Sequence, residues 1–129
     1  MHALRNIHAA LVPGGLIVDT QPVAARPTVT AGSVELGTAD MRRWIKTIGR
    51  LDRLAAEAIR KGLYRLSLEE QFTVTDTFSS GPECIEIMRG WRDTHVPVRL
   101  ARRLAEVETE VEIPQQVRLR LLASAGTAR

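Results

Sequence analysis

Leu4–Gln21, with the sequence LRNIHAALVPGGLIVDTQ, is the stretch from which the fold of this chain is interpreted. Its first apolar residues recur at steps of three and four, which predicts an amphipathic helix; they are Ala3, Leu4, Ile7 and Leu11. Pro13-Gly14-Gly15 then ends the helix and turns the chain. The run Leu16-Ile17-Val18 predicts a strand covered on both faces, with Asp19-Thr20-Gln21 as its polar exit. Helix, tight turn and buried strand together predict one unit of a doubly wound α/β fold.

The same residues resemble a known family. The pattern Leu-Arg-x-Ile-x-x-x-Leu-x-Pro-Gly-Gly-x-Ile-Val-Asp is similar to the helix–turn–strand that enters the fifth strand of class I S-adenosylmethionine-dependent methyltransferases. In that family the stretch lies past the middle of the catalytic domain, whereas here it begins at the first residue. The resemblance therefore implies the C-terminal part of a methyltransferase domain. The fold class it implies is α/β, a partial Rossmann-like fold with a mixed sheet, a small hairpin and flanking helices.

Length and composition allow one domain or part of one, because the chain has 129 residues. We expect residues 1–123 to form the C-terminal portion of the methyltransferase-like domain and residues 124–129 to be a flexible tail. The single Cys84 excludes an internal disulfide and favours the cytoplasm, where we expect it to be a small buried residue. No stretch approaches the roughly 20 apolar residues of a membrane span.

The middle of the chain predicts a hairpin and a long helix. β-branched residues flank a turn at Gly32, which predicts a hairpin over residues 28–36. Asp40 is a candidate N-cap for a helix over residues 41–61, and Gly62 is a candidate stop after its last turn. Ser80 and Glu83 have the spacing of a capping box at the start of a later helix, and Pro97 starts another.

Three segments are expected in one mixed sheet, namely residues 16–19, 72–77 and 117–122, with a kink at Pro114 before the last. In the family's order we expect the first segment to run against the other two. The residues expected to be buried are Leu16, Ile17, Val18, Ile48, Phe72, Val74, Ile85, Leu104, Leu119 and Leu121.

The order of these elements extends the resemblance over nearly the whole chain. The order resembles that of one bacterial branch of methyltransferase-like proteins. It consists of a hairpin, a long helix ending in Gly-Leu, a strand with Phe-x-Val and Phe-Ser-Ser, two helices and a final Val-x-Leu-x-Leu strand. The cofactor site departs from the family completely. No two of the nine glycines form a Gly-x-Gly turn, and no strand precedes the first expected helix. We therefore expect no catalytic or cofactor-binding residue here, and S-adenosylmethionine to bind only if a partner half completes the domain.

Six residues are candidates for a substrate site. Asp19 and Gln21 lie at the carboxyl end of the expected first strand, where open α/β sheets place ligands. Trp44, Tyr64, Trp91 and His95 could line the substrate cavity of a complete enzyme. A polar strand exit and aromatic core residues are the alternative interpretation. The three histidines and Cys84 have no metal-ligand spacing, so no metal site is expected.

Three classes of function remain open at this point. The first is the substrate-side and dimer-side half of a methyltransferase, inactive alone, whose companion half is lost or separately encoded. The second is a non-enzymatic interaction module that retains the fold. The third, a nucleic-acid binder, is suggested by the basic residues of the helix over 41–61 and disfavoured because the motifs and stacking aromatics of such proteins are missing. We expect a homodimer or a companion subunit to pair through Leu16, Ile17, Val18 and the first helix, because an uncharged apolar edge strand invites pairing.

Overall fold

The computed structural model describes residues 15–124, which form five strands and three helices. The strands are β1 (Leu16–Pro22), β2 (Thr28–Ala31), β3 (Val34–Thr38), β4 (Tyr64–Phe78) and β5 (Val111–Ser124). The helices are α2 (Arg42–Arg60), α3 (Gly81–Arg89) and α4 (Val98–Ala105). The α/β class is confirmed. The helix expected near residues 3–11 and the turn at Pro13-Gly14 lie outside the described residues.

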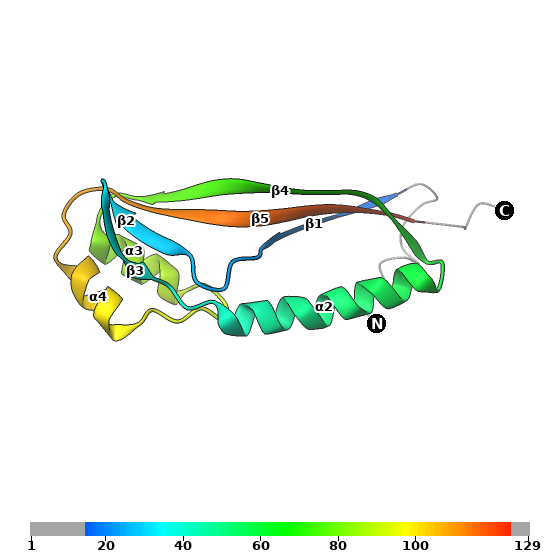
Figure 1. The fold of residues 1–129 in the computed structure, drawn as a ribbon, viewed down its shortest axis with the longest axis horizontal. Helices are drawn as coiled ribbons and strands as arrows, with labels where there is room; N and C mark the ends of the chain where they lie inside the picture. The colour runs from blue at the N-terminus through cyan, green and yellow to red at the C-terminus, as the bar shows by residue number, and fades with distance from the viewer. Residues whose placement is uncertain (1–14, 125–129) are drawn as a thin grey trace. The chain divides into compact units, whose positions relative to one another are not determined.

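The strands pair in the order β1-β5-β2-β3, and β4 pairs with β5 (Figure 1). This sheet is antiparallel and open, so the expected mixed sheet is wrong. The expected strand directions are also wrong. Both β1 and β4 pair antiparallel with β5, so β5 is the strand that runs against the other two. The long chain between β4 and β5, with its two helices, reverses the direction before the last strand is added.

The chain divides into two compact units. Unit 1 takes the described residues up to Gln21, together with Thr47–Gln71 and those from Arg118 onward, and unit 2 takes Pro22–Lys46 and Phe72–Val117. Helix α2 and strands β4 and β5 contribute residues to both units. The prediction of one domain over residues 1–123 stays a prediction.

Unit 1 has a small core built on the C-terminal half of α2. Ala58, Tyr64 and Leu122 are buried there, and Ile17, Ile59 and Leu63 pack against them. The helix ends as the sequence predicts. Gly62 has φ of 78°, its N–H bonds to the Ile59 carbonyl, and the Leu63 N–H bonds to the Ala58 carbonyl. These two bonds form the Schellman motif, whose left-handed position glycine occupies without strain.

Unit 2 has the larger core, formed by the β2–β3 hairpin, α3, α4 and the start of β5. Its buried residues are Val29, Leu36, Ala39, Phe78, Cys84, Met88, Val96, Leu100, Leu104, Val111 and Ile113. The hairpin prediction is confirmed, with Ala31 paired to Val34 around a turn in which Gly32 has φ of 62°. Burial raises the pKa of the Cys84 thiol to about 11, helped by the nearby Asp76 and Glu83, so this cysteine is protonated and inert at neutral pH.

Ser80 caps α3 as predicted, because its hydroxyl accepts a hydrogen bond from the Glu83 N–H at 3.3 Å. The second half of the expected capping box differs. The Glu83 carboxylate accepts hydrogen bonds from the backbone N–H and the hydroxyl of Ser79. The Glu83 side chain therefore bonds to Ser79, one residue before the cap, and connects the end of β4 to the start of α3.

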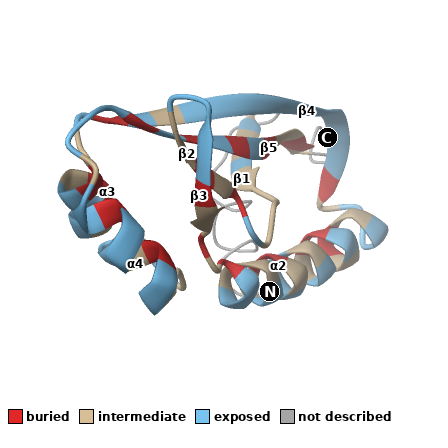
Figure 2. Ribbon diagram, turned by 60° about the vertical axis from the view of Figure 1, so that its left-hand side comes forward, coloured by how far each residue is buried: buried red, intermediate tan, exposed pale blue. Residues whose placement is uncertain are grey.

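Burial in the strands departs from several expectations (Figure 2). In β1, Leu16 and Val18 are 52% and 63% exposed and Ile17 is half-buried, so this strand is covered on one face only. Phe72 and Val74 are exposed, as is most of β4. Leu119, Leu121 and Ile85 are half-buried, whereas Ile48 and Leu104 are buried as expected. An apolar run without alternation does not reveal how many faces of a strand other elements cover.

Two strands are longer than the sequence predicts. Strand β4 begins at Tyr64, well before the expected segment of residues 72–77. Strand β5 begins at Val111 and continues through Pro114, where a kink was expected. The fixed φ of proline is compatible with extended backbone, which explains why Pro114 does not end the strand.

Candidate functional site

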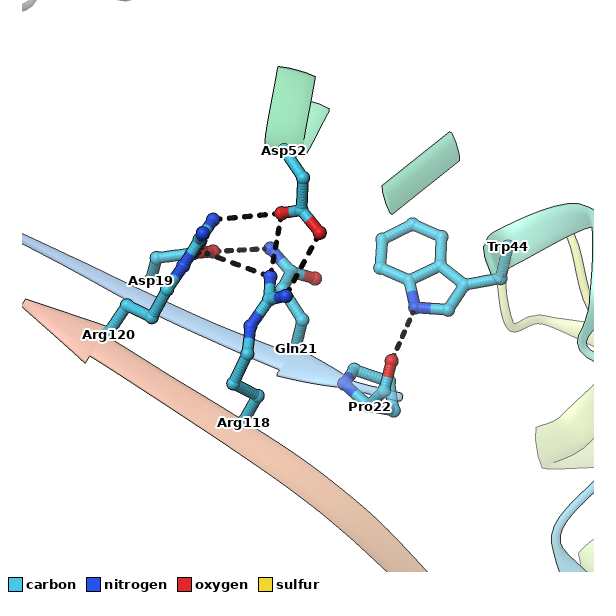
Figure 3. Close-up of polar contacts among 7 residues, drawn as sticks. All are labelled: Asp19, Gln21, Pro22, Trp44, Asp52, Arg118 and Arg120. Atoms are coloured by element: carbon cyan, nitrogen blue, oxygen red, sulfur yellow. Dashed lines mark hydrogen bonds and ion pairs between the residues drawn. The ribbon is translucent and has the colours of Figure 1, made fainter. Parts of the chain in front are cut away.

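Asp19 and Gln21 belong to a cluster of charged side chains inside unit 1 (Figure 3). The inward-facing positions of β1 place Asp19 next to Gln21, whose Nε2 donates to Asp19 Oδ1 at 2.8 Å. Arg120 on β5 donates to Asp19 Oδ2 from Nη2 at 2.9 Å and from Nε at 3.1 Å. The two candidate residues are therefore brought together, but an arginine already binds the carboxylate.

Asp52 on α2 completes this cluster. Arg118 binds it through two parallel hydrogen bonds, and Arg120 Nη2 reaches Asp52 Oδ1 at 2.9 Å. Arg118 Nη2 also lies 3.7 Å from Asp19 Oδ2. We call Asp19, Asp52, Arg118 and Arg120 the ion cluster. Two carboxylates and two guanidinium groups cancel in formal charge, although Arg118 Nε is buried without a hydrogen-bond partner.

Electrostatics within the ion cluster favour its charged form. Burial acts to raise the pKa of Asp52, but the hydrogen bonds and charges of Arg118 and Arg120 outweigh this effect and lower that pKa. The hydrogen bonds with Asp52 raise the pKa of Arg118 against the opposing effect of burial. A carboxylate held in this way is a poor general base, since its affinity for a proton is reduced. The ion cluster therefore ties α2 to β1 and β5, and arginines bind both of its carboxylates.

Sequence reasoning missed Asp52, Arg118 and Arg120 as members of this cluster. The signal was present in the closing strand, where the two arginines alternate with apolar residues and so point to the same face. In the sequence, Asp52 is one charged residue among several on the long helix. Only the fold places that position opposite two arginines, since the partners are separated by more than sixty residues.

The aromatic candidates mainly serve packing. Tyr64 is buried in the core of unit 1, and its burial raises the pKa of the phenol. Trp91 packs on the core of unit 2, where its ring centroid lies 6.3 Å from that of Phe78. Trp44 is half-buried and donates from Nε1 to the Pro22 carbonyl at 3.2 Å (Figure 3). The interpretation of Tyr64 and Trp91 as core residues fits these contacts better than a substrate role.

His95 lies in a different environment, at a pocket of unit 2. This pocket has a volume of about 460 Å³ and is lined by Asp40, Arg42, Arg43, Lys46 and His95. We call it the basic pocket. A candidate site residue from the sequence therefore lines a cavity that the structure describes.

The basic pocket is formed where helix α2 begins. Asp40 Oδ1 accepts from the Arg42 N–H at 3.1 Å, which confirms Asp40 as a cap. The Arg42 side chain also binds both oxygens of this carboxylate, at 2.9 Å and 2.7 Å. Hydrogen bonds from the side chain and backbone of Arg42 hold the pKa of the Asp40 carboxyl far below its ordinary value. Asp40 is therefore an anion at any ordinary pH, and Arg42 is its partner.

The charges around this helix start oppose helix stability. The first turn of α2 holds no acidic residue and begins with two arginines. Basic groups near a helix N-terminus are unfavourable, because the backbone dipole is positive there. Arg42 and Lys46 are also like charges four residues apart, which is unfavourable on a helix.

Metal binding and membrane crossing receive no support from the described part of the chain. Among residues 15–124, no three histidine, cysteine, aspartate or glutamate side chains are grouped so that they could hold a metal ion. The helices within that range are all too short or too polar to cross a bilayer. Comparison with known proteins finds no family model, no curated protein and no solved structure that matches this chain.

Proposed function

We propose that this chain is the substrate-side part of a methyltransferase-like domain, inactive as a methyltransferase by itself, which works in the cytoplasm. The observation that carries the proposal is the order of its elements. The elements follow one another in the order that the resemblance to class I methyltransferases implies. That order is a strand, a hairpin, a long helix ending before Gly-Leu, a strand, two short helices and a closing strand. A Rossmann-like arrangement of the complete domain is part of this proposal.

The residues present do not fit S-adenosylmethionine. None of the nine glycines forms the Gly-x-Gly turn that would follow a strand and hold the cofactor. Asp19, an acidic residue on a strand, is bound by Arg120 and by Gln21, so it is not available to hold a ribose hydroxyl. We therefore derive no methyl-transfer step from these residues. Any cofactor-binding half would be supplied by other residues or by a companion chain.

Methyl transfer mainly requires that donor and acceptor are positioned in line. The contribution proposed for this chain is to hold the acceptor. Of the six candidates, Asp19, Tyr64 and Trp91 are engaged in the ion cluster or the cores, and Trp44 is held by Pro22. His95 at the basic pocket is the candidate whose surroundings suit substrate contact best.

Titration calorimetry tests the proposed function directly. The isolated chain is titrated with S-adenosylmethionine and with S-adenosylhomocysteine, and we expect no binding heat at micromolar concentrations. A dissociation constant in the low micromolar range would contradict the proposal, since the chain would then hold the cofactor alone. An adjacent reading frame that encodes a glycine-rich turn after a strand would favour a split enzyme.

The second candidate is an interaction module without catalytic activity. It is favoured by the exposed apolar residues on β1 and β4, which are Leu16, Val18, Leu66, Leu68, Phe72 and Val74. Strand β1 is the last in the order β1-β5-β2-β3, so one of its edges carries no strand among the described residues. A homodimer or a companion subunit that pairs there, through Leu16, Ile17 and Val18, remains part of both candidate functions.

A further inference from the structure

Strand β4 forms an edge of the sheet. Among the described residues it pairs with β5 alone, so no strand of that part of the chain lies along its other edge (Figure 1). In the portion of β4 that belongs to unit 1, residues 65–71 are all exposed. An unpaired and exposed strand is a template for pairing with another strand. The side chains of this portion therefore decide which strand it accepts.

One face of this portion of β4 is polar. Side chains of a strand point alternately to the two faces of a sheet, so Arg65, Ser67 and Glu69 share a face. It is the face of the ion cluster, because the charge of Glu69 acts on Arg118. The Arg65 side chain makes no hydrogen bond or ion pair with the described residues, and both Arg65 and Glu69 are exposed. This face therefore presents one cation and one anion, four residues apart.

The opposite face of the same portion is mainly apolar. It carries Leu66 and Leu68, which are 42% and 38% exposed, followed by the exposed Glu70. An apolar side chain on an exposed edge strand gains burial when another apolar side chain is placed opposite to it. A matching strand must therefore present apolar residues opposite the two leucines and avoid placing a leucine opposite Glu70.

A second copy of β4 meets these requirements in one antiparallel register. If the two copies pair about a two-fold axis at Ser67, Arg65 of each copy lies opposite the partner's Glu69 on the polar face. On the other face, Leu66 of each copy lies opposite the partner's Leu68. Opposite charges and apolar side chains that face each other directly stabilise a pair of antiparallel strands. The strand is therefore complementary to itself in charge and in hydrophobicity.

Neighbouring registers lose this match. An axis at Leu68 places Leu66 opposite the partner's Glu70, and an axis at Glu69 places this carboxylate opposite its own copy, where like charges repel. Charged residues on an edge strand commonly keep other strands away. In β4 they exclude these registers and favour the one that is centred on Ser67.

We propose that the free edge of β4 pairs with β4 of a second copy, antiparallel and with Ser67 on the two-fold axis. The contact is isologous, because the same residues meet from both sides. Strands β1 and β4 each pair with β5, so pairing through β4 uses a different edge from pairing through β1. The overlap is short and its ion pairs are exposed, so we expect a weak association, with a dissociation constant of about 100 µM.

This inference goes beyond the proposed function and does not depend on it, since an enzyme half and an interaction module could both assemble in this way. The test is a disulfide across the axis in the full chain with Ser67→Cys. Val18→Lys is added to every variant, so that pairing through β1 does not contribute. Residues that face each other directly have Cβ atoms about 4.5–5.5 Å apart, which a disulfide can bridge after a small adjustment.

We expect Ser67→Cys to give a disulfide-linked dimer on mild oxidation, measured on a non-reducing gel at protein concentrations above the expected dissociation constant. The native Cys84 does not compete, because it is buried and its thiol is protonated at neutral pH. Gln71→Cys is the matched control, since Gln71 is exposed on the same face of β4. Its two copies would be eight residues apart along the paired strands, or about 27 Å, and should form little dimer.

Charge reversal connects the cross-link to the proposed pairs. Arg65→Glu, added to Ser67→Cys, places a carboxylate opposite Glu69 on both sides of the axis, so we expect the yield of linked dimer to fall about fivefold. Adding Glu69→Lys to that variant restores opposite charges in reversed order and should restore the yield.

Several outcomes would overturn the inference. Equal yields from Ser67→Cys and Gln71→Cys would assign the cross-link to random collision, and a higher yield from Gln71→Cys would assign it to another register. An Arg65→Glu variant that cross-links as well as its parent, or that Glu69→Lys does not rescue, would exclude the charge pairs as the reason for pairing. No linked dimer from Ser67→Cys would exclude the β4 contact itself. Circular dichroism establishes that each variant is folded.

Discussion

Arg118 binds Asp52 through two parallel hydrogen bonds, from Nη1 to Oδ2 at 2.9 Å and from Nη2 to Oδ1 at 2.8 Å. This bidentate pair joins the last strand to the long helix inside unit 1. The arginine side chain is 13% exposed, so little water competes for its hydrogen bonds. The contact therefore stabilises the fold more than an ordinary surface ion pair does.

Asp52→Ala is expected to lower the free energy of unfolding by about 1–2 kcal/mol. The change leaves two half-buried guanidinium groups with Asp19 as their shared carboxylate partner in the ion cluster. Chemical unfolding in urea measures the loss. Glu57→Ala is the matched control, because Glu57 lies on the same helix but its pair with Lys61 is exposed, and we expect a much smaller change in the free energy of unfolding. Equal losses in the two variants would contradict a special role for the ion cluster.

The contribution of Asp52 to stability should also depend on pH. The pKa of Asp52 is lower in the folded chain than its ordinary value of 3.8, so this carboxylate stabilises the folded state above that value. Its contribution is lost as the pH falls through the lowered folded pKa. We therefore expect the difference in unfolding free energy between the wild type and Asp52→Asn to be constant near neutral pH and to shrink below about pH 4. Urea unfolding at several pH values measures it, and a difference that grows in acid would be inconsistent with this assignment.

Gly81→Ala should be strongly destabilising. A Cβ atom at this position would lie 1.7 Å from the backbone oxygen of Leu104, at the point where the start of α3 meets the end of α4. The backbone cannot move aside as a flexible side chain can. We therefore expect the free energy of unfolding to fall by about 3 kcal/mol or more, at the upper end of the cost of overpacking. Thermal unfolding followed by circular dichroism measures the change.

Gly49→Ala provides the opposite case within α2. A Cβ at Gly49 meets only the end of the Arg53 side chain, at 3.8 Å. Alanine has the better helix propensity, so we expect this variant to be more stable by about 0.5–1 kcal/mol. A stabilised Gly81→Ala would show that the close approach at Gly81 does not determine its identity, and a destabilised Gly49→Ala would contradict the argument from helix propensity at Gly49.

Local signals in the sequence predict the helices and the hairpin well. The cap at Asp40, the stop at Gly62 and the cap at Ser80 are each decided by neighbours within a few residues, and the structure confirms all three. Turn chemistry at Gly32 predicts the hairpin for the same reason. Such features require no knowledge of the rest of the fold.

Burial and strand pairing were harder to predict because they depend on distant residues. The run Leu16-Ile17-Val18 indicates a strand, but whether one or two faces are covered depends on elements elsewhere in the chain. The same limit explains the candidate site. The sequence makes Asp19 a candidate substrate-site residue at the end of the expected strand, whereas Asp52, Arg118 and Arg120 are seen to surround it only in the fold.

The exposed edge of β1 leads to the last prediction. Val18 is 63% exposed on a strand that ends the order β1-β5-β2-β3. If two copies pair along this edge about a two-fold axis, residues near the axis lie opposite their own copies. Val18→Lys would then place like charges across the pair, which is unfavourable in a sheet. We expect light scattering at micromolar concentration to give the mass of a dimer for the wild type and of a monomer for Val18→Lys. Val98→Lys, which changes an equally exposed valine on α4, is the control and should remain a dimer. A monomeric wild type, or dissociation caused equally by both lysines, would exclude pairing of two copies through β1.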